Sequence, residues 1–277
     1  MNLDEQFAKA ARAIRSADAM VVTAGAGMGV DSGLPDFRGN QGFWNAYPMY
    51  ERLGYSFIDA ANPANFEGDP AFGWGFYGHR TNLYRETAPH RGFRMLQDWA
   101  GHFGQDSFVV TSNVDGQFQK AGYGEDQVLE VHGSIHHLQC LTPCCNEIWE
   151  NNETIPVDFD TMRAEQVPAC RFCRSAARPN ILMFGDYSWL PNRTRGQEMR
   201  FDSFLNQHRD AALVIIEMGA GTAIPTIRHL SESLGQRTRA KVVRINPREA
   251  HIGGGHVALP CRGLEGLDGI EEALGLS

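Results

Sequence analysis

The fold is decided by the stretch Thr23-Ala-Gly-Ala-Gly-Met-Gly-Val-Asp-Ser-Gly-Leu-Pro-Asp-Phe-Arg-Gly39. It follows the apolar run Ala19-Met-Val-Val-Thr23, which predicts a buried strand. Gly25 and Gly27 allow the backbone to turn tightly after that strand and to approach a ligand closely. Main-chain N–H groups in such a turn, next to the start of a helix, suit a phosphate group.

Glycines alone leave two interpretations open. The strict dinucleotide-binding fingerprint requires a third Gly or Ala where this chain has Val30, so the turn could also be tight without binding anything. Two further predicted strands favour a ligand site, because they end in the polar groups Asn113 and Asp115, and in His132. In open α/β sheets ligands bind outside the carboxyl ends of the strands, so we expect these groups to converge with Gly25.

Several motifs together resemble the sirtuins, a family of NAD-dependent protein-lysine deacylases. The family's Gly-Ala-Gly corresponds to Gly25-Ala-Gly27. Four further family blocks follow in the same order: Ser32-Gly-Leu-Pro-Asp-Phe-Arg-Gly39, Ser112-Asn-Val-Asp115, His132-Gly-Ser134 and Arg178-Pro-Asn-Ile-Leu-Met-Phe-Gly-Asp186.

The order of predicted elements indicates an α/β fold, with a Rossmann-like doubly wound parallel sheet. We expect helices at 3–16 and 91–103, and strands at 19–24, 107–112, 128–131, 180–184, 212–218 and 241–245. The predicted division gives residues 1–39, 86–139 and 178–277 to an NAD-binding domain. It gives 40–85 to a helical or loop module, and 140–177 to a small zinc-binding domain.

Composition narrows the class of protein. The chain has 277 residues, 42% of them hydrophobic, and a net charge of −8 without a Lys/Arg cluster, so we expect no nucleic-acid partner. Apolar runs are too short to predict a membrane span, and the polar N-terminus is unlike a signal peptide, so we expect a cytoplasmic protein. The oligomeric state is not indicated.

The cysteines predict a metal site. Cys170 and Cys173 form a C-x-x-C pair, and Cys140 precedes them with either Cys144 or Cys145. Four thiolates on two short turns are typical of structural zinc, whereas a reducing cytoplasm disfavours disulfides. The spacing leaves Cys144 and Cys145 open; the ligand spacing of some sirtuins favours Cys145. Cys261 is expected in the core.

The resemblance also implies roles around NAD. His132 would be the catalytic base and Asn113 would position the ribose or a water. Asp115 would hold the nicotinamide carboxamide, beside Ser112. The other expected NAD contacts are Ala26, Asp36, Phe37 and Arg38 in the first loop, Gly219, Ala220 and Gly221 after a later strand, and Asn246 at the adenine ribose.

Substrate contacts are expected at two places. Phe184 and Gly185 correspond to the segment that pairs with an acyl-lysine peptide as an added strand. Tyr77 and Arg80 lie three residues apart, hence on one helix face, and match a Tyr-x-x-Arg of sirtuins that remove succinyl or malonyl groups. The alternative is an amphipathic helix with a solvated Arg80.

Some positions depart from the family pattern. Ser112 replaces a Gln, Gln117 and Phe118 replace Leu-His, Gly29 replaces a Ser, and Ala220-Gly221 replaces Thr-Ser. These changes leave open an NAD glycohydrolase, an ADP-ribosyltransferase or a non-catalytic NAD sensor, beside the expected deacylase that releases nicotinamide and O-acyl-ADP-ribose.

Overall fold

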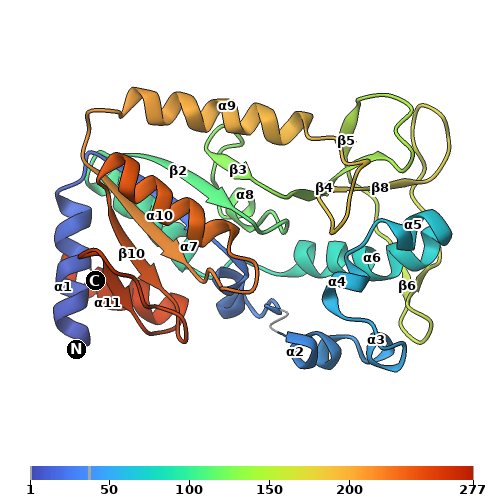
Figure 1. Ribbon diagram of the computed structural model, residues 1–277, viewed down its shortest axis with the longest axis horizontal. Helices are drawn as coiled ribbons and strands as arrows, with labels where there is room; N and C mark the ends of the chain where they lie inside the picture. The colour runs from blue at the N-terminus through green and yellow to red at the C-terminus, as the bar shows by residue number, and fades with distance from the viewer. Residues whose placement is uncertain (1, 37–38, 277) are drawn as a thin grey trace.

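A computed structural model describes residues 2–36 and 39–276 of the chain (Figure 1). In these ranges a parallel sheet has the strand order β11-β10-β9-β1-β2-β3. Its strands are β1 (Ala19–Ala24), β2 (Asp106–Thr111), β3 (Val128–Glu130), β9 (Leu213–Met218), β10 (Lys241–Ile245) and β11 (Val257–Leu259). The chain winds outward from β1 in one direction and later from β9 in the other, so these two adjacent strands form the topological switch point.

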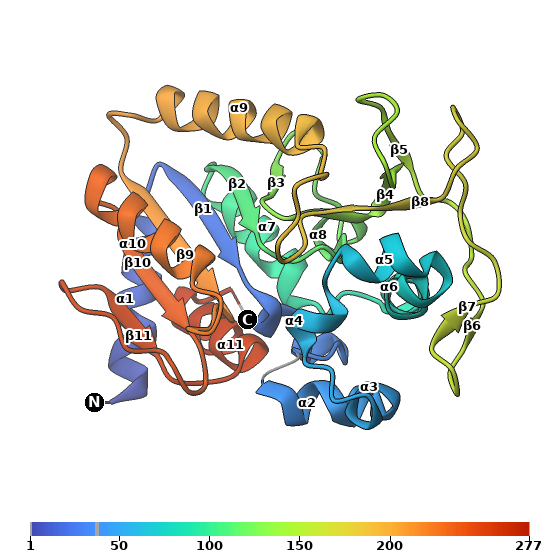
Figure 2. The same cartoon turned by 45° about the vertical axis from the view of Figure 1, so that its right-hand side comes forward.

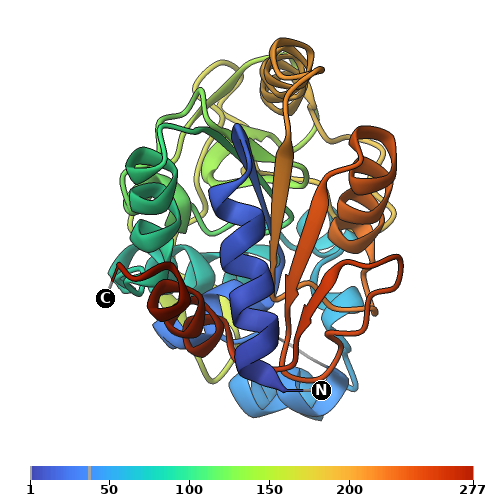
Figure 3. The same ribbon diagram turned by 90° about the vertical axis from the view of Figure 1, so that its left-hand side faces the viewer.

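Helices cover both faces of this sheet. The helices α1 (Leu3–Arg15), α7 (Gly92–His102) and α11 (Gly263–Leu274) share one core, and α9 (Asn192–Gln207) and α10 (Thr226–Thr238) share the other. Figure 3 shows α1 beside α11. Met20 and Val22 of β1 enter the first core, while Ala19 and Val21 enter the second. Because both faces are buried, β1 is a continuous apolar run.

A second body stands beside the sheet (Figure 2). It contains α2 (Gly39–Ala46), α3 (Pro48–Arg52), α4 (Phe57–Ala60), α5 (Ala64–Gly68), α6 (Pro70–Glu86), the antiparallel sheet β5 (Ile148–Glu150)-β4 (Gly133–Cys140)-β8 (Ala177–Ile181), and the pair β6 (Val157–Asp158) and β7 (Arg163–Ala164). One aromatic-rich core joins these helices and strands. Gly75 of α6 permits close packing, because a Cβ there would lie 1.8 Å from the Met162 carbonyl oxygen.

The expected doubly wound parallel sheet is confirmed, and the helices expected at 3–16 and 91–103 correspond to α1 and α7. The strand expected at 180–184 overlaps β8 only at Asn180 and Ile181, because β8 begins at Ala177 and ends at Ile181; it pairs antiparallel with β4. A short apolar run predicts a strand but does not specify which strand it pairs with. In the described ranges, no helix is both long and apolar enough to span a bilayer.

Candidate active site

A cavity of about 610 Å³ lies at the carboxyl ends of the central strands. Its wall combines loops that follow β1, β2, β3, β9 and β10 with side chains of α4 and α6 and with residues 181–184. The sequence-predicted residues on this wall are Gly25, Ala26, Gly27, Asp36, Tyr77, Arg80, Ser112, Asn113, Asp115, His132, Phe184, Gly219, Ala220 and Gly221. The volume is in the range of ordinary small-molecule and cofactor sites.

The glycine loop meets the loop after β9 through main-chain atoms. The Gly25 amide donates to the Met218 carbonyl (2.9 Å) and the Gly27 amide donates to the Gly219 carbonyl (3.0 Å). Gly219 has φ +59°, and a Cβ there would lie 2.4 Å from the carbonyl carbon of Gly27. These glycines are therefore required for contact between two loops. The amides of Gly25 and Gly27 therefore donate to carbonyl groups around the end of β9, and not to a phosphate as the glycine pattern predicted.

Asn113 and Asp115 are fixed by the loop that follows β2. The Asn113 side-chain amide donates to the Gly25 carbonyl (3.1 Å), which ties this loop to the glycine loop. The Asp115 carboxylate accepts from the Gln117 amide (3.0 Å) and is 9% exposed. Burial raises the pKa of Asp115 to about 6, against the hydrogen bond from Gln117. Asp115 thus lies on the wall as an acid that titrates just below neutral pH.

His132 lies two residues after β3, on the same wall. Its main-chain carbonyl accepts from the Leu182 amide (2.9 Å), which joins it to the segment after β8. Burial lowers the pKa of the imidazole, and a hydrogen bond to the Ser112 backbone partly opposes this shift. A neutral imidazole at pH 7 is able to accept a proton from a bound hydroxyl group.

A buried cation lies in the part of the wall formed by α6. Arg80 is 8% exposed, and its Nε donates to the Tyr84 hydroxyl (2.8 Å). Its guanidinium carbon lies 5.0 Å from the ring centre of Phe76. Burial raises the pKa of Tyr77 to about 12, although the charge of Arg80 opposes this shift. The phenols therefore stay neutral while Arg80 carries a full positive charge.

Not every predicted residue lies on the wall. Asn246 is buried behind it: its side-chain amide donates to the Ala220 carbonyl (2.9 Å), and its oxygen accepts from the Glu249 amide (2.9 Å). Asn246 thus shapes the two loops around it. Gly185 is not among the residues that line the cavity. Phe37 and Arg38 lie outside the described residues.

The predicted site residues leave out four polar wall residues: Tyr84, Thr222, Arg248 and Glu249. Tyr84 follows Arg80 by one helical turn, which was an available signal. Arg248 and Glu249 lie two and three residues after Asn246, but nothing in their spacing indicated the direction of their side chains. Of the departures from the family pattern, Phe118 is buried in the core and does not reach the cavity.

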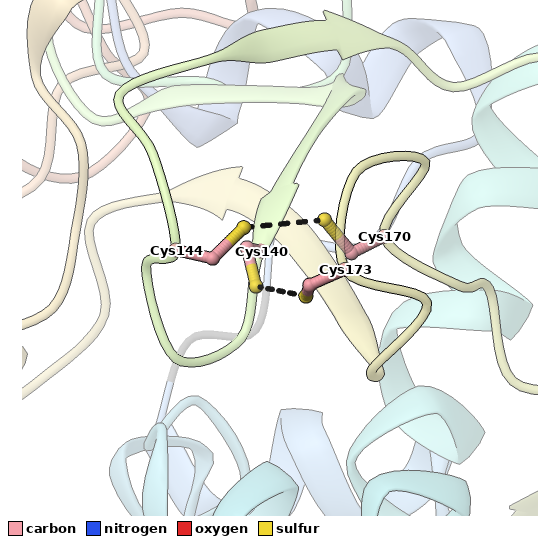
Figure 4. Close-up of side chains that lie close together, drawn as sticks. All are labelled: Cys140, Cys144, Cys170 and Cys173. Carbon is pink, nitrogen blue, oxygen red and sulfur yellow. Dashed lines mark hydrogen bonds between the residues drawn. The ribbon is translucent and has the colours of Figure 1, made fainter.

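The metal-site prediction needs one correction. The sulfurs of Cys140, Cys144, Cys170 and Cys173 all lie within 4.8 Å of one another (Figure 4). The prediction that Cys145 is the fourth ligand is therefore wrong. Adjacent residues direct their side chains differently, and the turn directs the Cys144 sulfur toward the other three sulfurs. The Cys140–Cys173 and Cys144–Cys170 sulfur distances are 3.6 and 3.8 Å. Tetrahedral zinc with Zn–S bonds of about 2.3 Å requires edges of about 3.8 Å, so the donor set suits zinc.

Together the switch-point loops, the buried acid and the neutral imidazole define a nucleotide-binding α/β protein with a candidate catalytic cavity. The model of the Sir2 family matches residues 25–216, and the chain belongs to this family.

Individual relatives are similar over nearly the whole chain. The chain is 30% identical over 253 residues to NAD-dependent protein deacylase 1 of Archaeoglobus fulgidus. The aligned region covers 90% of this chain and 89% of that protein. It is 27% identical over 244 residues to a probable bifunctional ADP-ribose hydrolase/ADP-ribosyltransferase of Fusarium oxysporum, covering 84% of this chain and 41% of that protein. A solved Sir2 homologue mutant with ADP-ribose is 25% identical, with a TM-score of 0.69 and coverage of 97% and 98%.

Proposed function

We propose that this protein is an NAD-dependent protein-lysine deacylase. The observation that carries the proposal is the convergence of Asn113, Asp115 and His132 with the glycine loop on one cavity wall. The named activity of the Archaeoglobus relative supports it. The products would be nicotinamide, the free lysine and O-acyl-ADP-ribose.

When bound, NAD would supply the glycosidic bond between ribose and nicotinamide, and the acyl oxygen would replace nicotinamide on that ribose carbon. Asp115 would accept a hydrogen bond from the carboxamide, and burial of its side chain strengthens that contact. Asn113, held by the Gly25 carbonyl, would keep the ribose in position. His132 would accept the proton of a ribose hydroxyl, so that this oxygen can capture the acyl carbon. Most of the rate would come from positioning.

The protein substrate would enter along residues 182–185. The Leu182 amide donates to the His132 carbonyl and the Phe184 amide donates to the Ala61 carbonyl (3.0 Å), so this segment, which turns at Phe184 and Gly185, is held against both sides of the cavity. An acyl-lysine peptide adding to such a segment gains main-chain hydrogen bonds with little sequence selectivity.

The experiment that tests the activity is mass spectrometry of the products formed from NAD and a panel of acyl-lysine peptides. Formation of O-acyl-ADP-ribose in stoichiometric amount with nicotinamide is the expected result. Nicotinamide release from NAD alone, at an equal rate without peptide, would instead support NAD hydrolysis.

For the acyl group, we propose that the site accepts succinyl or malonyl chains. A distal carboxylate near Tyr77 and Arg80 would gain charge-assisted hydrogen bonds in a water-poor wall. Arg80→Met should lower kcat/KM for a succinyl-peptide by roughly tenfold or more, and change acetyl-peptide turnover much less. Arg209→Met, at a site 77% exposed, is the control. An equal loss for both peptides would contradict the proposal.

The second candidate is NAD glycohydrolysis or ADP-ribosyl transfer. Ser112, in place of the longer Gln, lies on the cavity wall, and the Fusarium relative bears a corresponding name. A shorter side chain leaves room for water beside the ribose. Ser112→Gln should then raise the ratio of deacylation to NAD hydrolysis; an unchanged ratio would remove this candidate.

We further propose that Cys140, Cys144, Cys170 and Cys173 hold a structural zinc ion. The two thiol-bearing turns lie at the end of the β4–β8 sheet, where a metal would hold them together. Elemental analysis of the folded protein should give about one zinc per chain. Folded protein without metal would refute the site.

A further inference from the structure

Tyr84 is the polar wall residue that hydrogen-bonds to the buried cation Arg80. It lies one helical turn after Arg80 on α6, lines the cavity and is 4% exposed. Its hydroxyl oxygen accepts hydrogen bonds from Nε of Arg80 (2.8 Å) and from one Nη of the same guanidinium. This pair of nitrogens is an edge that suits bidentate contact with a carboxylate. Tyr84 therefore occupies an edge of Arg80 that a ligand carboxylate would otherwise take.

Tyr77, the other phenol near this cation, is placed differently. Its ring centre lies 6.0 Å from the guanidinium carbon of Arg80, against 5.2 Å for Tyr84. In residues 2–36 and 39–276, no hydrogen bond joins the Tyr77 hydroxyl to Arg80. The sequence pattern thus pairs Arg80 with Tyr77, whereas the hydrogen bonds pair it with Tyr84.

The Tyr84 hydroxyl still has a proton to donate. A phenol oxygen has two lone pairs and one O–H, and the two bonds from Arg80 use both lone pairs. Within the part of the chain that the structure describes, this O–H has no acceptor. Burial raises the pKa of Tyr84 against the opposing charge of Arg80, so the proton stays in place at neutral pH. The cavity wall therefore offers a buried donor, which the two cationic N–H groups behind it strengthen.

The loop that follows β2 fixes the position of this donor. The Gln117 side-chain amide donates to the Tyr84 carbonyl (3.1 Å), and the Gln117 main-chain amide donates to the Asp115 carboxylate (3.0 Å). Asp115 is near enough for its charge to raise the pKa of Tyr84. Gln117 stands where the sirtuin pattern has Leu, which could not make the bond to the Tyr84 carbonyl. This departure from the pattern thus joins Tyr84 to the loop that carries Asp115.

We propose that the Tyr84 hydroxyl donates directly to the distal carboxylate of a succinyl or malonyl group, while Arg80 holds and polarises this hydroxyl from behind. Tyr84 takes this role only if the proposed preference for such acyl groups holds. It is then a specificity-determining residue. An acetyl group has no distal carboxylate and leaves the buried donor without an acceptor, which costs free energy, whereas a carboxylate gains a charge-assisted bond at the same place.

Tyr84→Phe tests the contact, because it removes the hydroxyl and keeps the ring. Calorimetric titration of the whole protein with a succinyl-peptide and with the matching acetyl-peptide measures binding without turnover. The Kd for the succinyl-peptide should rise about tenfold or more, and the Kd for the acetyl-peptide should change much less. With NAD present, kcat/KM should show the same difference between the peptides. The control is Tyr123→Phe, which removes a hydroxyl bonded to the Phe93 carbonyl (3.1 Å) in the core beside the sheet and should change neither Kd.

A double variant separates donation by Tyr84 from positioning of Arg80. If Tyr84 only orients Arg80, then Tyr84→Phe should have no further effect once Arg80→Met has removed the guanidinium. We expect instead that adding Tyr84→Phe to Arg80→Met raises the Kd for the succinyl-peptide by about a further threefold or more, because the hydroxyl can donate without the cation. The Tm of each variant verifies that it is folded.

Two results would overturn the proposal: an unchanged ratio of the two Kd values in Tyr84→Phe, or no added effect in the double variant. Equal binding of both peptides by the wild type would overturn it together with the proposed acyl preference. Succinyl-selective binding that depends on Tyr84, but without formation of O-acyl-ADP-ribose, would support the contact and refute the proposed deacylation. Failure of the contact and failure of the proposed activity are therefore distinguishable.

Discussion

Gly219→Ala tests whether close contact between the two switch-point loops supports the cavity. Gly219 has φ +59°, a conformation that costs a non-glycine residue about 1–2 kcal/mol. The new Cβ would also lie 2.4 Å from the Gly27 carbonyl carbon and 2.5 Å from the Met28 nitrogen. These are backbone atoms that cannot rotate away, so we expect a total loss of about 3 kcal/mol in unfolding free energy.

The loss should appear in two assays. Thermal unfolding should show a decrease in Tm of about 6–12 °C, since each kcal/mol shifts a domain of this size by about 2–4 °C. Calorimetric titration should show weakened NAD binding, because the displaced loops line the cavity.

The matched control is Gly101→Ala in α7, where a Cβ would meet nothing within 4 Å. This change should stabilise the protein by about 0.5–1 kcal/mol. The reasoning would be refuted by a Gly219→Ala variant with wild-type Tm and NAD affinity.

Three further predictions follow from the structure. Arg178→Met should lower the free energy of unfolding by about 3–5 kcal/mol, because it leaves the fully buried Asp186 carboxylate without its partner cation. Burial raises the pKa of Asp186, but the bonds from Arg178 outweigh this effect and lower the pKa. Wild-type stability should therefore decline as pH falls through that lowered pKa, and an acid titration of the variant should lack this decline. His132→Ala should reduce deacylation by roughly 100-fold or more while calorimetry still detects NAD binding. Because burial lowers the pKa of His132, its contribution to the acid limb of the wild-type kcat/KM profile should lie below pH 6.5. A His132-dependent limb above that value would contradict its role as the base. Zinc removal by chelator during unfolding should prevent refolding until zinc is restored, which circular dichroism would follow; unaided refolding would argue against a structural metal.

Much of the fold was predictable because its signals are local. The apolar runs of β1 and β9 predicted buried strands, and the apolar residues of α1 follow helical spacing. The motifs around Gly25, Asn113 and His132 also indicated one site, since the carboxyl ends of parallel strands meet at one edge. The pair Cys170 and Cys173 indicated metal from spacing alone.

What remained depended on side-chain direction and on contacts between distant segments. Sequence spacing could not show that the Gly25 amide is bonded to Met218, that Asn246 lies behind the wall, or that Tyr84 engages Arg80. Nor could it choose between Cys144 and Cys145, which differ only in the orientation that the turn gives to each sulfur. The sequence therefore determined the elements and the chemistry available to the site. Tertiary structure decided which atoms face the cavity and the metal, because packing of remote loops sets those directions.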